Sequence, residues 1–263
     1  MRRFMLTLWA IVITILAVAS LAVFCAKPAS AVTPNKTVFL TFDDGPGMYT
    51  TQVLDQLRKY QAKATFFYIG EHMQQYPELT RQADAEGHEL ANHTMDHPHL
   101  ADLTEAEVKQ ELLSAQSVMR SLGVASNCFR PPFFSTSPAV EEWGREVGLH
   151  QVMYRNDVTD PRDVTIGRAS EPDPMKIYRN VTSTVFDGAI VTLHAENHDN
   201  LGQLQALALI LPKLKSMGYA MKALPGCNRP LTRIMPLGDS ITSGVGQNYG
   251  KYSYRTQLDT YLR

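Results

Sequence analysis

The sequence predicts an α/β fold: a distorted, incomplete (β/α)7-type barrel with a short C-terminal βα fragment. From residue 36 to about residue 223, short apolar runs alternate with segments of helical periodicity. Such alternation is typical of parallel strands whose connecting helices lie outside the sheet. Seven strand-like runs favour an incomplete barrel over a closed barrel of eight strands. A hydrophobic content of 44% and a charged content of 19% are ordinary for globular domains and argue against disordered and coiled-coil classes.

The predicted strands are short apolar runs, and several of them end in polar or turn-forming residues. The first of them, with Val38, Leu40 and Phe42, leads directly into two aspartates. The seven runs cover residues 38–42, 64–69, 89–92, 128–130, 151–154, 189–194 and 219–222.

Three segments have apolar side chains at helical spacing. The second opens with Thr104 and Glu107, a pair typical of a capping box. The third contains Pro212, so a kink or break is expected there. These predicted helices cover residues 50–60, 104–122 and 201–217.

Residues 1–31 have the features of an export signal. Arg2 and Arg3 precede an uncharged apolar stretch, and Ala29-Ser30-Ala31 forms a small-x-small cleavage site beyond it. A cleaved signal peptide is expected, with a retained membrane anchor as the alternative because the stretch is long enough to span a bilayer. The basic N-terminus would stay inside, so a secreted or cell-surface protein is expected.

Charge and cysteine content limit the functional classes and the expected covalent links. The net charge is −1, which argues against a general nucleic-acid binder. Two of the three cysteines, Cys128 and Cys227, lie beyond the export segment. Outside the cytosol such a pair persists as a disulfide. We therefore expect a bridge between them, with two buried free thiols as the alternative.

Five polar clusters follow predicted strands, and reactive residues of βα folds lie at the carboxyl ends of strands. In the first cluster, Asp43 and Asp44 would repel each other unless a cation or hydrogen bonds intervene. The alternative for this cluster is a solvated Asp-Asp-Gly-Pro turn. In the second, the i, i+4 spacing of His93 and His97 would place both imidazoles on one face of a helical turn. Two such imidazoles and a nearby carboxylate would form a three-ligand metal set with an open position.

The other three clusters are ambiguous when taken singly. Arg130 precedes two prolines and would hold a carboxylate through a bidentate contact, or belong to a surface turn. Asp157 and Asp160 follow the fifth strand and would otherwise form a solvated acidic loop. His194 ends the sixth strand and would otherwise be a core histidine.

Taken together, the five clusters resemble the polysaccharide deacetylase family, carbohydrate esterase family 4, whose domain is shared with nodulation-type chitooligosaccharide deacetylases. The Thr-Phe-Asp-Asp-Gly-Pro block at residues 41–46 and the His-Thr-x-x-His block at residues 93–97 carry the resemblance most specifically. It covers residues 37–225, and it assigns the deacetylase domain to residues 32–227.

The resemblance implies a metal site and a set of catalytic roles. Asp44, His93 and His97 would hold a divalent metal, zinc first, with cobalt, nickel or manganese as alternatives. Asp43 would act as the base, held and oriented by Arg130.

The same resemblance implies an acid and a set of substrate contacts. His194 would be the acid, paired with Asp160, and His198 is the fallback. Phe133 would donate its backbone N–H to the oxyanion, and Pro132 and Leu193 would contact the substrate. Phe133 stands where a tyrosine is common in the family, and the adjacent Leu193-His194 pair departs from the commoner Leu-x-His spacing.

The implied activity is that of an exported, metal-dependent hydrolase that removes acetyl groups from an N-acetylated polysaccharide, such as chitin oligomers or peptidoglycan. The alternatives are an acetylxylan O-deacetylase with the same site and a non-catalytic carbohydrate-binding module on the same fold. The expected partner is the acetylated polysaccharide, with no nucleic acid, and with membrane contact only through an uncleaved N-terminal segment. A monomer is expected.

Residues 228–263 are expected to be a linker and a truncated second domain. Gly238-Asp239-Ser240 resembles the first block of the SGNH (Gly-Asp-Ser) hydrolase family, with Ser240 as its nucleophile. No histidine follows His198, so this serine would be a vestigial nucleophile without a base. The alternatives are a coincidental turn and a serine esterase that residues 32–227 merely support.

Overall fold

The computed structural model describes residues 34–153, 173–196 and 200–227, and it contains a sheet of seven parallel strands. These are β1 (Lys36–Gly45), β2 (Thr65–Tyr68), β3 (Glu89–Asn92), β4 (Cys128–Phe129), β5 (His150–Gln151), β6 (Ala189–Leu193) and β7 (Tyr219–Lys222). Their order is β5-β4-β3-β2-β1-β6, and β7 also pairs with β1. Within the described ranges no strand pairs with the outer edge of β5. The sheet is therefore an open, curled half-barrel, which confirms the predicted fold class.

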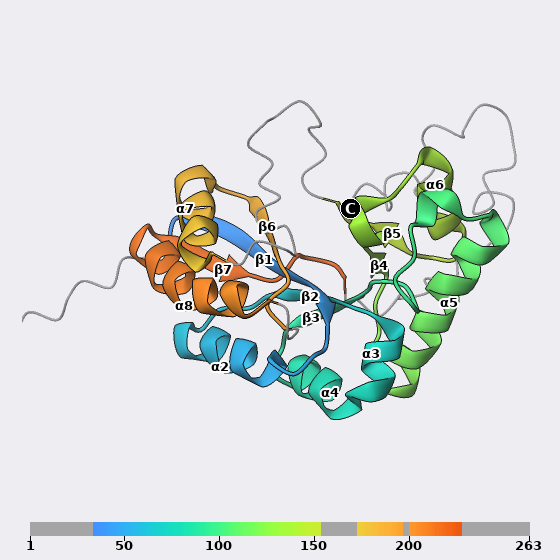
Figure 1. The fold of residues 1–263 in the computed structure, drawn as a ribbon, viewed down its shortest axis with the longest axis horizontal. Helices are drawn as coiled ribbons and strands as arrows, with labels where there is room; N and C mark the ends of the chain where they lie inside the picture. The colour runs from blue at the N-terminus through green and yellow to red at the C-terminus, as the bar shows by residue number, and fades with distance from the viewer. Residues whose placement is uncertain (1–33, 154–172, 197–199, 228–263) are drawn as a thin grey trace, which may run out of the picture. The chain divides into compact units, whose positions relative to one another are not determined.

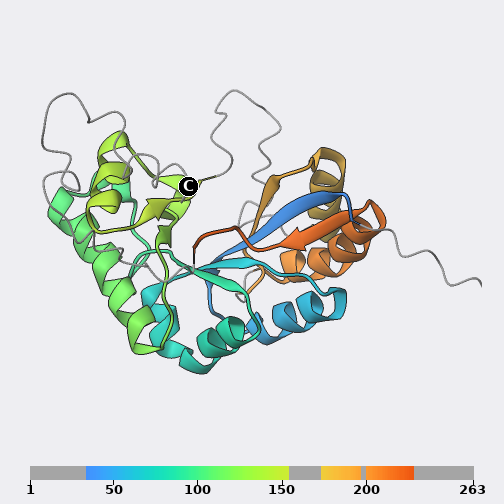
Figure 2. The same cartoon turned by 180° about the vertical axis from the view of Figure 1, so that it is seen from behind.

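Helices lie along the outside of this sheet, as Figures 1 and 2 show from opposite directions. They are α2 (Thr50–Tyr60), α3 (Gly70–Gln75), α4 (Pro77–Ala85), α5 (Glu105–Ser121), α6 (Pro138–Glu146), α7 (Pro174–Thr184) and α8 (Leu201–Ser216), with 3-10 turns η1 (Leu100–Asp102) and η2 (Pro132–Phe134). None of the helices of the described residues is long and apolar enough to cross a membrane.

Most predicted elements are confirmed, and a few differ from the prediction. The capping box of Thr104 and Glu107 opens α5 as expected. Helix α8 continues through Pro212 as one element, so of the expected kink or break the break is wrong, and the kink stays a prediction. Its residues Ile210, Leu211 and Leu214 are all fully buried, and this packing holds both halves of the helix in place. Helices α3, α4, α6 and α7 were not predicted, although α4, α6 and α7 carry a proline in the first turn, a common start signature.

The core is built on β1, whose side chains are covered on both faces, as expected for a parallel sheet. Val38, Leu40 and Phe42 have no exposed surface. The ring of Phe42 stacks on that of Phe66 from β2, with centroids 5.1 Å apart. The hydroxyl of Thr41 donates to the carbonyl oxygen of Val191 in β6. These contacts hold the carboxyl end of β1 between its two neighbouring strands.

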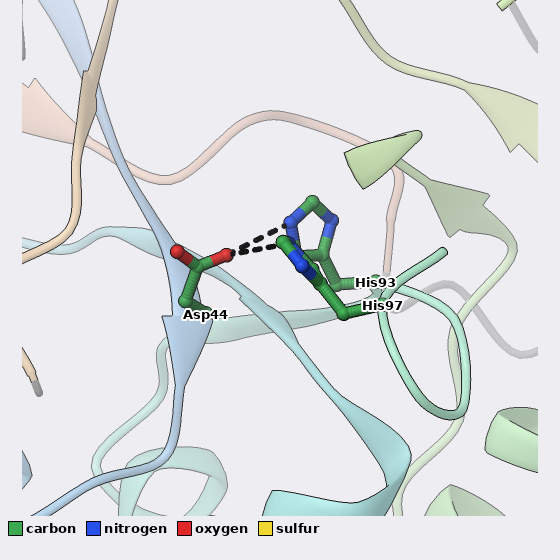
Figure 3. Close-up of side chains that lie close together, drawn as sticks. All are labelled: Asp44, His93 and His97. Carbon is green, nitrogen blue, oxygen red and sulfur yellow. Dashed lines mark ion pairs between the residues drawn. The ribbon is translucent and has the colours of Figure 1, made fainter. Parts of the chain in front are cut away.

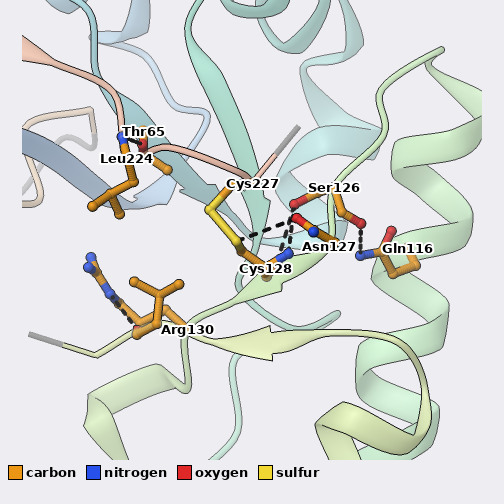
Figure 4. Close-up of a disulfide and its surroundings, with 9 residues drawn as sticks. Thr65, Gln116, Ser126, Asn127, Cys128, Arg130, Leu224 and Cys227 are labelled. Carbon is orange, nitrogen blue, oxygen red and sulfur yellow. Dashed lines mark hydrogen bonds between the residues drawn. A yellow bond between two sulfur atoms is a disulfide. The ribbon is translucent and has the colours of Figure 1, made fainter. Parts of the chain in front are cut away.

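A disulfide joins Cys128 of β4 to Cys227, and it confirms the expected bridge (Figure 4). The two residues lie 99 positions apart in the chain. Next to the bridge, the N–H of Asn127 donates to the carbonyl oxygen of Cys227 at 2.9 Å. The bridge therefore fastens the segment after β7 to the strand that leads to Arg130.

We expect replacement of both Cys128 and Cys227 by serine to lower the free energy of unfolding by about 4–5 kcal/mol, because the bridge restricts a long loop of the unfolded chain. Urea denaturation followed by far-UV circular dichroism measures this difference. A reductant should weaken the wild-type protein in the same way and leave the double variant unchanged. Equal urea midpoints for the two proteins would contradict a stabilising role.

Candidate metal centre and active site

The predicted polar residues gather at the carboxyl ends of neighbouring strands. Asp43 and Asp44 end β1, and His93 follows β3 directly. Arg130 follows β4, and His194 follows β6. Because all these strands are parallel, their carboxyl ends meet at one edge of the sheet.

Asp44 lies where β1 departs from regular pairing. A register shift falls between Asp43 and Gly45, and Asp44 has a left-handed backbone with φ of 70°. Aspartate adopts this region more readily than most residues do. The Nδ1 atom of His72 donates to the Asp44 carbonyl oxygen at 2.8 Å and holds this conformation.

The side chains of Asp44, His93 and His97 converge on one point (Figure 3). The Oδ1 atom of Asp44 lies 3.2 Å from Nε2 of His93 and 3.0 Å from Nε2 of His97. Two ligand atoms about 2.0–2.1 Å from one tetrahedral ion lie about 3.3 Å apart. Two imidazole nitrogens and a carboxylate oxygen at this spacing fit a divalent metal such as zinc.

Hydrogen bonds orient Asp44 and His93 and shift the pKa values of both. The Nδ1 atom of His93 lies 2.8 Å from the carbonyl oxygen of Arg130, so Nδ1 carries a proton and donates it. This bond aims Nε2 at Asp44 and orients the ring as second partners of metal ligands do. Burial would raise the pKa of Asp44, but hydrogen bonds from His93 and His97 hold it well below its ordinary value. Burial would lower the pKa of His93, yet the bond to Asp44 and the charges of Asp43 and Asp44 raise it.

The loop that carries the two histidines is not the helical turn that their spacing predicted. Residues 93–97 form an irregular loop in which Thr94 and His97 have left-handed φ values of 69° and 68°. Local hydrogen bonds to side chains replace those of a helix: the N–H of Thr94 donates to Asn92 Oδ1, and that of His97 donates to Thr94 Oγ1. The left-handed residues reverse the chain direction, and this brings the rings of His93 and His97 together.

Glu111 is a residue of this site that the sequence did not single out. Its Oε2 atom accepts the N–H groups of Met95 and Asp96 at 3.0 and 3.1 Å. The carboxylate thus holds the loop between the two histidines from helix α5. In the sequence, Glu111 is one polar residue among several on a predicted helix, and nothing distinguishes it from a solvent-exposed one.

Asp43 lies beside the predicted ligands and is held by Arg130. The Nη1 atom of Arg130 donates to Asp43 Oδ1 at 2.6 Å and to Thr41 Oγ1 at 2.9 Å. Arg130 is completely buried, and its guanidinium lies over the ring of Phe67 at 4.0 Å. The contact with Asp43 uses one nitrogen and is not the expected bidentate fork, because Nε donates instead to the carbonyl oxygen of Val152.

His194 lies on the other side of Asp44, at the end of β6. Its Nε2 atom is 3.9 Å from Asp44 Oδ2, and its backbone N–H donates to Gln203 Oε1. Its Nδ1 atom is buried and has no hydrogen-bond partner among the described residues. The predicted partner Asp160 and the fallback acid His198 lie outside the described residues, as do residues 1–31 and Ser240.

The three predicted substrate contacts have different surroundings. Phe133 is 58% exposed and stacks on the ring of His99, with its edge near His97. Pro132 is buried. Leu193 has no exposed surface and pairs in register with Phe42, so it belongs to the core. Its contact with the substrate stays a prediction.

Comparisons with known proteins identify the family to which this chain belongs. A sequence profile of the polysaccharide deacetylase family matches residues 30–152. A peptidoglycan-N-acetylglucosamine deacetylase of Bacillus cereus is 38% identical over 189 residues, which cover 71% of this chain and 86% of that protein. A chitooligosaccharide deacetylase of Bradyrhizobium is 35% identical over 210 residues, covering 74% of this chain and 91% of that protein.

Comparison of the fold with solved structures indicates the same family. The solved structure of the peptidoglycan deacetylase PdaC from Bacillus subtilis matches with a TM-score of 0.62 and 29% identity, covering 73% of this chain and 90% of that one. The chain belongs to the polysaccharide deacetylase family, carbohydrate esterase family 4.

Proposed function

We propose that this enzyme removes the acetyl group from N-acetylglucosamine units of peptidoglycan or chitooligosaccharides by metal-dependent hydrolysis. The observation that carries the proposal is the convergence of Asp44, His93 and His97 beside a second carboxylate, Asp43, that is held by a buried arginine. Two of the relatives reported above are named as deacetylases of these two glycans. A non-catalytic carbohydrate-binding module would have no use for this combination of groups.

Asp43 would act as the general base. Arg130 donates to Oδ1, so Oδ2 is the oxygen that would take a proton from the attacking water. The same contact with Arg130 fixes the orientation of Asp43. A divalent ion held by Asp44, His93 and His97 would supply Lewis-acid polarisation of the acetyl carbonyl and would lower the pKa of water.

His194 would act as the general acid. Its Nε2 atom faces Asp44 and would donate a proton to the departing amine. Its buried Nδ1 atom, which lacks a partner in the described part of the chain, would donate to Asp160.

Phe133 would contribute to substrate binding on the rim of the site. Its exposed ring and the stacked ring of His99 present an aromatic surface next to His97. Its backbone N–H would donate to the oxyanion, which places a fixed dipole where negative charge develops.

The export segment and the limits of the deacetylase domain are proposed from the sequence. We propose export through residues 1–31 and a deacetylase domain that spans residues 32–227. The described elements run from Lys36 to Lys222, and the disulfide reaches Cys227, which supports these limits. The resemblance of the segment around Ser240 to SGNH hydrolases has no support in the comparisons, and we assign it no activity.

Removal of the metal should abolish acetate release, because no Lewis acid would then polarise the acetyl carbonyl. The measurement is acetate release from chitooligomers before and after dialysis against a chelator, with metal content followed in parallel. Addition of zinc should restore the rate. Full activity in protein shown to be free of metal would overturn the metal-dependent mechanism.

The two neighbouring aspartates should behave differently when each is replaced by asparagine. Asp43→Asn should lower kcat by about 10²–10⁴-fold while the protein keeps its metal, because it removes the base. Asp44→Asn should lower metal affinity first, because it removes a ligand. Titration of each variant with zinc, together with its kcat, separates the two roles. Metal loss in Asp43→Asn with metal retained in Asp44→Asn would reverse the assignment.

Among acetylated polymers, we expect peptidoglycan and chitooligomers to be deacetylated with a higher kcat/KM than acetylxylan. The two relatives reported above are named as deacetylases of peptidoglycan N-acetylglucosamine and of chitooligosaccharides. Acetate release from the three polymers at equal acetyl concentration provides the comparison. A higher kcat/KM on acetylxylan would favour O-deacetylation by the same site.

A further inference from the structure

Glu196 is a buried carboxyl group that the proposed reaction does not use. It lies two residues after His194, beyond the end of β6, and has no exposed surface. Its Oε1 atom accepts hydrogen bonds from Thr50 Oγ1 at 2.5 Å and from the phenol of Tyr68 at 3.0 Å. Among the described residues, no basic side chain forms an ion pair with it. Hydrogen bonds, and not an ion pair, therefore compensate for the burial of this carboxyl group.

Those hydrogen bonds hold the turn that follows Asp44. The carbonyl oxygen of Glu196 accepts the N–H of Tyr49 at 2.8 Å. Thr50 Oγ1, which donates to the carboxyl group, accepts the N–H of Gly47 at 2.8 Å. The backbone of Glu196 therefore holds Tyr49 and its side chain holds Thr50, and Thr50 in turn holds Gly47 at the other end of the segment.

The contact with β1 is also close. A Cβ atom at Gly45 would lie 2.3 Å from Glu196 Oε2 and 2.6 Å from the ring of Tyr68. Only glycine allows the carboxyl group to lie against the backbone at this point, which is the residue immediately after Asp44. Glu196 thus connects the ends of β1, β2 and β6.

This connection spans the two groups whose separation matters for the reaction. Asp44 precedes the turn that Glu196 holds, and His194 precedes Glu196 on the other strand end. Their facing atoms, Oδ2 and Nε2, are 3.9 Å apart. A displacement of about 1 Å between reacting groups can cost about 10²-fold in rate.

We propose that Glu196 is a positioning residue that sets the distance between the metal-ligand carboxylate of Asp44 and the imidazole of His194. The proposal rests on the proposed function for the roles of these two residues. Glu196 contacts neither the substrate nor the metal in this assignment, and it acts through the turn at residues 45–50.

The protonation state of Glu196 suits this role. Burial raises its pKa to about 8, against the lowering effect of the bonds from Thr50 and Tyr68, and the charges of Asp44 and Asp43 add to the rise. The side chain is therefore a neutral acid at pH 7, and glutamine is close to it in shape and charge. Glu196→Gln is the conservative variant, whereas Glu196→Ala removes the acceptor.

The test compares these two variants with a matched pair of tyrosines. Tyr68→Phe removes the phenol that donates to Glu196. Tyr219→Phe is the control, because it removes a similarly buried phenol that donates to the carbonyl oxygen of Val185. Tyr219 lies far from the site, since it pairs with Lys36 at the other end of β1. The measurements are kcat and KM for acetate release from chitooligomers, and the visible spectrum of the Co²⁺-loaded protein, which reports the ligand geometry.

We expect Glu196→Ala to lower kcat by about tenfold or more with KM within about twofold, and to shift the Co²⁺ spectrum. Glu196→Gln should recover kcat to within about threefold of wild type, because it retains the acceptor oxygen. Tyr68→Phe should lower kcat by about threefold or more, and Tyr219→Phe should leave it within about twofold. If Glu196→Ala does not fold, Tyr68→Phe and Glu196→Gln still provide the comparison.

The proposal is overturned if Glu196→Ala and Tyr68→Phe keep the wild-type kcat and spectrum. It is also overturned if Tyr219→Phe lowers kcat as much as Tyr68→Phe does, because the loss would then reflect packing in general. A wild-type protein without metal-dependent activity would refute the proposed function instead. In that case the Co²⁺ spectrum still decides the role of Glu196. A spectral shift in Glu196→Ala supports the positioning role even without activity data, and an unchanged spectrum overturns it.

Discussion

Strand β1 is the element on which the rest of the structure depends, because it pairs with three other strands. At ten residues it is the longest strand described, and it pairs with β2, β6 and β7. Its apolar residues form the centre of the core, and the same strand ends in the two aspartates of the site. A change in its register would move the core residues and the carboxylates together, because side chains alternate along a strand. Packing and chemistry are therefore tied to one stretch of backbone.

Three carboxyl groups lie near the end of this strand, and each is accommodated in a different way. Asp43 is paired with a buried guanidinium. Asp44 faces two imidazoles in an arrangement that suits a cation. Glu196 keeps its proton, because burial and the other two carboxylates disfavour its charge. Three negative charges at this separation in a buried region would repel strongly, so the site is stable only because each group has its own means of compensation.

The parts of the molecule that were predictable are those in which neighbouring residues decide the structure. The strands, the capping box of α5 and the order of the polar clusters all follow from local patterns. The loop from His93 to His97 was predicted wrongly because its shape depends on Glu111, which is 16 residues away from Met95 in the chain. No local pattern indicates a role for Glu196, because its partners Tyr68 and Thr50 are 128 and 146 residues away in the chain. The sequence gives the chemistry of a site more readily than the contacts that support it.

The pairing of β1 with late strands has a consequence for the order in which the chain acquires structure. Thr41 of β1 bonds to Val191 of β6, 150 residues later, and β7 comes later still. Contacts this distant in sequence make folding slow, because a large loop must close before the contacts can form. During synthesis the residues that end β1 emerge early, yet their neighbours on β6 and β7 arrive near the end of the domain. The site is therefore assembled last, so a chain that is still leaving the ribosome would carry Asp43 and Asp44 without the neighbours on β6 that lie beside them in the folded protein.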